Sequence, residues 1–594
     1  MRAVVYVALG TRRIGAAVAH TAGLAAAGTP VTLLIADRPE WTGAGIAPGV
    51  TVLRVPAGAT GAVLRAARRL LLAAGSPLRD GDLLVAGDPE ALAVAWSVGR
   101  RRPEVVIRLE PSGEPGRRTA AAGLAVVTPW YPSPDDPYAG AFVQAATAAT
   151  GPDHDRVAVL HTQNWYYSPT GVTGTRVGVA AERQAARSGH AVVLDTPEGE
   201  LTRVAVPTAA GRGYPAFAEA QVRALRASLP TGRIEAPLVH AHTGMLAGVV
   251  ATRLARPDAR IVVTEHATFL AEVFRQPGAR QQYAAMLARA DAVLCVGGHL
   301  RDQLAGFFPG YAHKLRVVPN AIDFDRFAMR PRPPRELLRW LYAGRLMAHK
   351  GVLTLVDGFA RIAAEDPRVT LTLVGAGPLA DPLDRRIAAL GLGGRITRRP
   401  PVPPGEVTAL MHEHDLLVHA SRRETFGMTV VEAVATGTPV LVARSQGPQE
   451  TLAGVAGLAG LLIEPSDDPA VIADGYRRLR SRLSTLDLPA ARAALAARYG
   501  SAAVAARLRE VYAPDSAGPA GAPAAPAPTV AASRPWPVRL GRLVLVGAPD
   551  GVLGGLQWAA SRVPAPGPEA VVRRFRRVPG AVRDRMAGRC RAAP

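Results

Sequence analysis

Two glutamates eight residues apart carry the clearest chemical signal in this chain, within the stretch SRRETFGMTVVEAVATGTPV at residues 421–440. An apolar run at 416–420 predicts a buried strand before it, and residues 429–436 are typical of a helix. Glu424 then lies in the turn and Glu432 within the helix. Gly427 permits a tight bend, so that free N–H groups at the helix start face a ligand. Carboxylates so placed can accept pairs of hydroxyl protons, and the N–H groups suit phosphate or sugar oxygens.

Two cations stand on one predicted strand-to-helix loop. The strand WLYAGR runs into Gly344 and Arg345, and Lys350 follows in LMAHKG. Arginine can bind a diphosphate as a fork and lysine as a point charge. The next strand ends in VGAGP, with Gly375 and Gly377. A lone G-x-G is weak, and the third glycine of a dinucleotide fingerprint is missing, so we do not predict NAD or FAD.

Histidines end two further predicted strands, in VHAH with His240 and His242 and in VTEH with His266. In a parallel sheet the carboxyl ends of the strands gather ligands. No third ligand accompanies the HAH pair, so no metal site is predicted.

Strands and Ala/Arg-rich helices alternate along most of the chain, which predicts doubly wound parallel sheets. Five segments are expected. Residues 1–118 form an N-terminal α/β domain without a catalytic constellation, 119–328 a second unit, and 329–512 a third that holds the Glu and Arg/Lys motifs. Residues 513–535 are an Ala/Pro-rich linker, and 536–594 a basic C-terminal tail.

The motifs together resemble those of retaining, GT-B-fold glycosyltransferases of the family 4 type (glycosyl transferases group 1). The matching strings are E-x7-E with FG after the first Glu, G-R-L-x3-K-G, V-G-x-G-P and PNAID, in order between about residues 130 and 512. The resemblance implies two Rossmann-like domains facing across a cleft. It covers neither the first 118 residues nor the tail, and Gly447-Pro448 departs from the family's paired glycines.

The resemblance also implies roles for individual residues. The catalytic set comprises His266, Arg345, Lys350 and Glu424. The donor-binding set comprises Gly344, Gly375, Gly377, Phe426, Gly427, Met428, Thr429 and Glu432. Weaker acceptor-side candidates are Gly140, His242 and Asn320. Asp323-Phe324-Asp325 spells D-x-D but lies in the inter-domain connection, so it is interpreted as structural.

The chain has 594 residues and a formal charge of 70 − 48 = +22, which favours an anionic partner. Arginine bias in composition weakens that inference.

The two cysteines form no disulfide framework, and neither a signal peptide nor a bilayer-spanning run is expected, which predicts a cytoplasmic protein. The basic amphipathic tail suggests peripheral attachment to the anionic inner face of the cell membrane, with a solvated tail as the equal alternative.

The predicted function is transfer of a sugar, of hexosyl type, from a nucleotide-diphosphate sugar to a hydroxyl of a glycan, lipid or small-molecule acceptor, with retention, in carbohydrate biosynthesis. No cofactor or metal is expected, because Arg345 and Lys350 supply the positive charge. The alternatives are a GT-B epimerase or phosphorylase, and a non-catalytic, basic surface-docking protein with a relic GT-B body. Nucleic acid is not a predicted partner, because Phe575 is the only aromatic residue among the arginines of residues 571–591.

Overall fold

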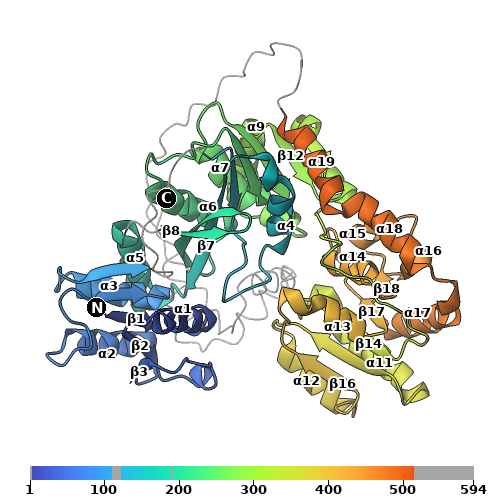
Figure 1. Cartoon of the computed structure of the whole chain (residues 1–594), viewed down its shortest axis with the longest axis horizontal. Coiled ribbons are helices and arrows are strands. Elements are labelled where there is room, and N and C mark those ends of the chain that lie inside the picture. The colour runs from blue at the N-terminus through green and yellow to red at the C-terminus, as the bar shows by residue number, and fades with distance from the viewer. Residues whose placement is uncertain (1–2, 110–121, 189–190, 514–594) are drawn as a thin grey trace, which may run out of the picture. The chain divides into compact units, whose positions relative to one another are not determined.

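Three helix-covered sheets, made almost entirely of parallel strands, account for the strands in the residues that the computed structural model describes, which are 3–109, 122–188 and 191–513 (Figure 1). All described residues belong to one compact unit. The predicted α/β class is confirmed by these sheets.

The first sheet has five parallel strands in the order β3-β2-β1-β4-β5. Its strands are β1 (Val4–Ala8), β2 (Val31–Ala36), β3 (Val50–Val55), β4 (Leu83–Ala86) and β5 (Val106–Leu109). Its helices are α1 (Ile14–Ala26), α2 (Thr60–Leu72) and α3 (Pro89–Gly99). Alternate residues of β1 point to opposite faces, so Val5 and Val7 join one core cluster and Val4 and Tyr6 another.

The second sheet has eight strands in the order β13-β12-β11-β10-β6-β7-β9-β8, parallel except for the β8–β9 pair. The strands are β6 (Leu124–Thr128), β7 (Val157–Tyr167), β8 (Ala191–Thr196), β9 (Gly199–Ala209), β10 (Leu238–His242), β11 (Arg260–Glu265), β12 (Ala292–Cys295) and β13 (Leu315–Val317). The main helices are α4 (Ala141–Thr150), α5 (Gly171–Ser188), α6 (Tyr214–Ser228), α7 (Val249–Leu254), α9 (Ala279–Arg289) and α10 (Gly298–Phe307).

The apolar runs of the sequence predict strands at 157–161 and 191–194 but none between 199 and 209, so β9 was missed and β7 is longer than expected. In β9 the polar residues Thr202 and Arg203 and the Pro207 ring interrupt the apolar run, although most of the strand is buried. Long pairing with β7 over ten positions makes the strand. Its identity therefore depends on a partner about 40 residues away.

The third sheet has six parallel strands in the order β16-β15-β14-β17-β18-β19. The strands are β14 (Arg339–Ala343), β15 (Thr370–Val374), β16 (Ile396–Arg399), β17 (Leu416–His419), β18 (Val440–Ala443) and β19 (Gly460–Ile463). The main helices are α11 (Val352–Glu365), α12 (Ala380–Ala389), α13 (Val407–Glu413), α14 (Met428–Ala435), α15 (Gln446–Thr451), α17 (Pro469–Ser481) and α18 (Leu488–Tyr499).

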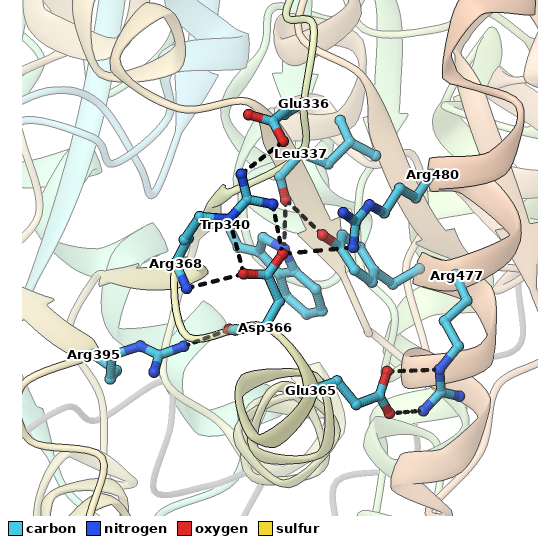
Figure 2. Close-up of polar contacts among 10 residues, drawn as sticks. Glu336, Leu337, Trp340, Glu365, Asp366, Arg368, Arg395, Arg477 and Arg480 are labelled. Atoms are coloured by element: carbon cyan, nitrogen blue, oxygen red, sulfur yellow. Dashed lines mark hydrogen bonds and ion pairs between the residues drawn. The ribbon is translucent and has the colours of Figure 1, made fainter.

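A polar cluster fixes the far end of α11 against α17 (Figure 2). The Asp366 carboxylate binds the Arg368 guanidinium at 2.9 Å and lies 3.6 Å from Arg480. Hydrogen bonds from Arg368 hold the pKa of Asp366 down at about 2. Next to it, Arg477 of α17 pairs with Glu365, the last residue of α11. The helix that begins beside Lys350 is therefore anchored at its other end.

The last described helix, α19 (Ser501–Tyr512), packs into the core of the second sheet, where Val504 and Leu508 cluster with Leu124. The chain thus returns from the third sheet to the second. The domain boundaries of the sequence analysis stay predictions. Nearly all of the predicted linker, the whole tail and residues 110–121, where the first predicted domain boundary falls, lie outside the described residues. Within the described ranges, no helix combines the length and the apolarity that a membrane crossing requires.

Candidate functional site

The strand order of the third sheet defines where a ligand belongs. From β14 the chain runs outward through β15 and β16, and then crosses to the other side for β17, β18 and β19. The crevice at the carboxyl ends of β14 and β17 is therefore the topological switch point, where doubly wound sheets bind ligands. The Arg345/Lys350 loop follows β14, and the Glu424 turn follows β17. The two motifs of the sequence analysis meet at this crevice.

Glycines let the loops after β14 and β15 lie directly on each other. A Cβ on Gly375 would be 1.9 Å from the Gly344 carbonyl oxygen, and one on Gly377 would be 2.5 Å from the Leu346 oxygen. Backbone hydrogen bonds from Gly344 to Val374 and from Leu346 to Ala376 join the same loops. The Tyr342 hydroxyl also donates to the Arg345 carbonyl at 2.7 Å. Arg345 thus stands on a fixed loop with its side chain exposed.

Lys350 and Glu424, 74 residues apart, form an ion pair of 2.5 Å between Nζ and Oε2. Gly351 has a φ of +67°, and a Cβ there would be 2.3 Å from the Ala420 oxygen, so only glycine lets the first loop lie on the end of β17. The Arg422 N–H donates to the His349 carbonyl at 2.8 Å. Both charged side chains are about 15% exposed. The pair is a preformed, partly desolvated charge cluster at the crevice.

The Glu424 carboxylate is ionised. Burial alone would raise its pKa, but the Lys350 ammonium, and then the His419 ring 3.6 Å away, hold the pKa of Glu424 well below its usual range. His419 was not among the residues expected from the sequence. Its signal was the same as that of His242, a histidine at the last position of a strand.

Helix α14 begins at Gly427, whose φ of +88° places it in the left-handed region. Gly427 has no side chain that could cap the helix, and the first N–H groups of any helix have no partner within it. Phe426 is buried and packs edge-on against Tyr499 at 5.2 Å. The helix start is thus held by packing; that its N–H groups face a ligand stays a prediction.

Glu432 lies on α14 in a different environment from Glu424. Burial raises the pKa of Glu432 to about 7, and the Arg326 charge opposes that rise only in part. At neutral pH the carboxyl is therefore about half protonated. The sequence shows the position of Glu432 but not this shift, since it depends on desolvation by the surrounding fold.

The second sheet contributes histidines from neighbouring strand ends. His242 Nδ1 lies 3.1 Å from His266 Nε2, and the Phe142 ring packs on His266 with centroids 4.2 Å apart. Burial lowers the pKa of His266 to about 3, while a hydrogen bond with the Asn320 side chain opposes that change. His266 is thus neutral at pH 7 and can serve as a hydrogen-bonding group. The fold brings His242, His266 and Asn320 together.

Other polar residues at these strand ends are structural. His240 binds Thr264 and the Tyr512 hydroxyl, each at 2.7 Å. The buried Glu265 carboxylate accepts hydrogen bonds from the Tyr283 hydroxyl and from the backbone N–H groups of Gly244, His266 and Ala267. Sequence spacing could not separate the structural residues His240 and Glu265 from the site residues His242 and His266, because all four occupy strand ends.

Gly140 caps α4 with a φ of +68°, and a Cβ there would be 2.0 Å from the Trp130 oxygen. It therefore closes the 129–140 loop on itself. Asp323 accepts the N–H groups of Asp325 and Arg326, which is a local turn. Within the described ranges no cluster of three or more His, Cys, Asp or Glu side chains could hold a metal. The metal-free site stays a prediction.

Two contacts join the Glu424 turn to the second sheet. The Thr425 hydroxyl donates to the His266 carbonyl at 3.1 Å, and Arg423 pairs with Glu272 at 2.7 Å. The turn that carries Glu424 and the strand end that carries His266 therefore belong to one site. Neither Arg423 nor Thr425 was expected from the sequence to contact the second sheet.

Comparison with known proteins agrees with this geometry. The family described as "Glycosyl transferases group 1" matches residues 326–482, and "Glycosyltransferase Family 4" matches residues 173–326. A glycogen synthase of Mycobacterium tuberculosis is 31% identical over 279 residues, which are 42% of this chain and 64% of that protein. A D-inositol 3-phosphate glycosyltransferase of Streptomyces scabiei is 30% identical over 306 residues, 46% of this chain and 67% of that protein.

The chain thus spans just under two thirds of the glycogen synthase. Among solved structures, sucrose-phosphate synthase from Thermosynechococcus elongatus has a TM-score of 0.50 at 18% identity, over 66% of this chain and 98% of that one. This likeness concerns the fold. Two adjoining family matches, a relative aligned over two thirds of its length, and the switch-point motifs lead to one conclusion: the chain belongs to the GT-B-fold glycosyltransferases of the family 4, group 1 type.

Proposed function

We propose that this protein is a retaining glycosyltransferase that moves a sugar from a nucleotide-diphosphate donor to a hydroxyl of a glycan, lipid or small-molecule acceptor. The observation that carries the proposal is the Lys350–Glu424 pair beside Arg345 and the open start of α14, all at one switch point. This arrangement offers cations and N–H donors for a diphosphate and carboxylates for hydroxyls. The curated relatives bear names of sugar-transferring enzymes, which supports the same class of activity.

Each group has a place in the proposed reaction. Glu432 receives the ribose hydroxyls, Arg345 and Lys350 bind the diphosphate, and Glu424 with His266 faces the sugar. As the glycosidic C–O bond breaks, negative charge grows on the leaving diphosphate. Fixed cations and helix N–H groups there stabilise the transition state more than the ground state. In this proposal Arg345 and Lys350 supply the charge that a metal supplies in other sugar transfers.

Retention is the outcome that the family resemblance implies, and the proposal assigns the carboxylates accordingly. Glu424 is bound to Lys350, and Glu432 is assigned to ribose, so neither is assigned as a nucleophile on the sugar. The acceptor hydroxyl then attacks on the face that the diphosphate leaves. The diphosphate oxygens accept the hydroxyl proton, so no protein base is required. The stereochemistry of the product, determined by NMR, tests this step.

The activity is tested with UDP-, GDP-, ADP- and TDP-sugars in EDTA, by thermal shift and by release of the nucleoside diphosphate. We expect one donor to stabilise the wild type and to lose its effect in Glu432→Ala. Glu464→Ala is the matched control, since the Glu464 side chain is 74% exposed. A response to none of the sugars contradicts the proposal. An epimerised donor, or release of a sugar 1-phosphate, identifies an epimerase or a phosphorylase instead.

Donor affinity is expected to rise with pH through about 7. Ribose hydroxyls donate to the ionised carboxylate, and the pKa of Glu432 is raised to about 7 by burial. UDP-glucose, whose phosphates do not titrate in this range, should bind about tenfold more weakly at pH 6 than at pH 8, which is the ratio of the ionised fractions. Calorimetry on the wild type and on Glu432→Gln measures this slope. An equal slope in both proteins would refute the assignment.

The same shift makes a prediction for the unliganded protein. When the pKa of a carboxyl is higher in the folded than in the unfolded state, the protein loses stability as the pH rises from the unfolded pKa of about 4.5 to the folded pKa of about 7. Glu432→Gln removes that loss. We therefore expect the variant to have a higher Tm than the wild type at pH 8, and the difference to vanish near pH 4.5. A constant difference across this range would contradict the prediction.

A further inference from the structure

The first sheet, which lies outside both family matches, has a switch point of its own. Strands β1 and β4 are neighbours at its centre, and the turn from Gly10 to Arg13 leads from β1 into α1. In a doubly wound domain the backbone N–H groups of this turn and of the first helical turn meet the anionic group of a ligand. What these N–H groups bind therefore indicates what the domain does.

Carboxylates of the chain itself occupy this position. The Gly10 N–H donates to Asp88 Oδ2 at 2.7 Å, and the buried Asp88 also caps α3 through Ala91 at 2.6 Å. In the first turn of α1, the Ala16 N–H donates to Asp135 Oδ1 at 2.8 Å. Asp135 lies 119 residues further along, in the 129–140 loop that follows β6.

The contact with Asp135 is built from several parts. Arg13 Nη1 lies 3.1 Å from Asp135 Oδ2, and both side chains are nearly buried, at 10% and 13% exposure. Arg13 is itself held by the Gly87 carbonyl at 2.8 Å and by the Trp165 ring at 4.4 Å. Gly15 permits the approach, because a Cβ there would be 2.9 Å from the Pro134 oxygen.

The other end of the same loop reaches the candidate site. The close approach of Gly140 to Trp130 closes the loop, and Arg203 donates to the Pro132 carbonyl at 2.7 Å. Two residues after Gly140, Phe142 packs on His266. The loop is therefore held at Asp135 by the first sheet and ends against the histidine that the proposed mechanism places at the sugar.

We propose that the domain of the first sheet serves as a buttress: its anion position at α1 and Arg13 bind the Asp135 carboxylate in place of a ligand, and thereby fix the 129–140 loop and Phe142 against His266. Asp135 is then a positioning residue for the transfer reaction. The catalytic part of this inference rests on the proposed function. The docking of Asp135 stands without it.

The test uses the full chain and three variants. Asp135→Lys places a positive charge against Arg13 and against the start of α1. Asp135→Asn keeps the size of the side chain but removes the ion pair. Asp136→Lys is the matched control, with the same charge change at an exposed neighbour whose carboxylate binds only the local Tyr138 N–H among the contacts described. Hydrogen exchange by mass spectrometry follows residues 129–142 and the first turn of α1. UDP-glucose binding and hydrolysis to UDP are measured in parallel.

For Asp135→Lys we expect at least tenfold faster exchange in both segments, about threefold for Asp135→Asn, and no change for Asp136→Lys. UDP-glucose should bind all four proteins alike, while its turnover falls about tenfold in Asp135→Lys.

Wild-type exchange in both Asp135 variants overturns the docking. Faster exchange with full turnover overturns the positioning role. If Asp135→Lys also exchanges faster in β14 and β17, that variant is unfolded more widely, and the exchange of Asp135→Asn then decides whether Asp135 holds the loop. If UDP-glucose is not a donor, the exchange result still decides the docking.

Discussion

Replacing Lys350 with methionine is expected to lower sugar transfer by about a hundredfold to a thousandfold, the loss typical of removing one preorganised group that stabilises charge in a transition state. It is also expected to destabilise the protein by about 3–5 kcal/mol, because the largely buried Glu424 carboxyl loses the cation that offsets its burial. Initial rates with the identified donor and denaturant unfolding measure the two effects.

The double variant Lys350→Met/Glu424→Gln separates those effects. Without the unpaired charge, we expect most of the stability to return, while transfer stays lost. Arg361→Met is a control for removal of a cation. The Arg361 side chain is half-exposed, and its carboxylate partner Asp468 is 3.8 Å away, which makes this pair longer and more exposed than Lys350–Glu424. If the single variant were as stable as the wild type, the ion pair would not be the buried contact described above. If the double variant regained transfer, Lys350 would not stabilise the leaving group.

Gly375→Ala is expected to weaken UDP-sugar binding and turnover by about a hundredfold or more. A Cβ at Gly375 would lie 1.9 Å from the Gly344 oxygen, so the loop that carries Arg345 must move. A displacement of about 1 Å at a reacting group is enough for a loss of that size. Calorimetry with the identified donor and steady-state kinetics measure the loss.

Gly393→Ala is the matched control, because a Cβ at Gly393 meets no atom within 4 Å. We expect this variant to bind and turn over the donor as the wild type does. A Gly375→Ala protein with normal binding would show that the contact between the two glycine turns does not position Arg345.

Much of the third sheet could be predicted from the sequence because its signals are local. The strands β14, β15 and β17 are short, largely apolar runs, and each leads into a loop that contains glycine, so residue types and element boundaries agree within a few positions. The left-handed Gly427 also follows from its place between a strand and a helix. Strand β9 could not be found in this way, since its pattern becomes a strand only when paired with β7.

The parts of the site that depend on distance in the chain came only from the tertiary structure. Lys350 and Glu424 were assigned separate ligands from the sequence, whereas the fold pairs them directly. The raised pKa of Glu432 and the neutral His266 come from desolvation, which depends on every element packed around them. The roles assigned to these residues, retention of configuration and metal independence remain predictions for the experiments above.

The sequence by itself determined the family, the order of the doubly wound units and the loops that carry the candidate site, because strand periodicity and motif spacing depend on neighbouring residues. Only the tertiary structure decided which side chains meet, because contacts such as Lys350–Glu424 and Arg13–Asp135 depend on strand order and on glycines that let distant backbones touch. No local pattern in GTRRIG or PSPDDP indicates that one binds the other. That contact exists because the folded chain places a carboxylate at the open end of α1.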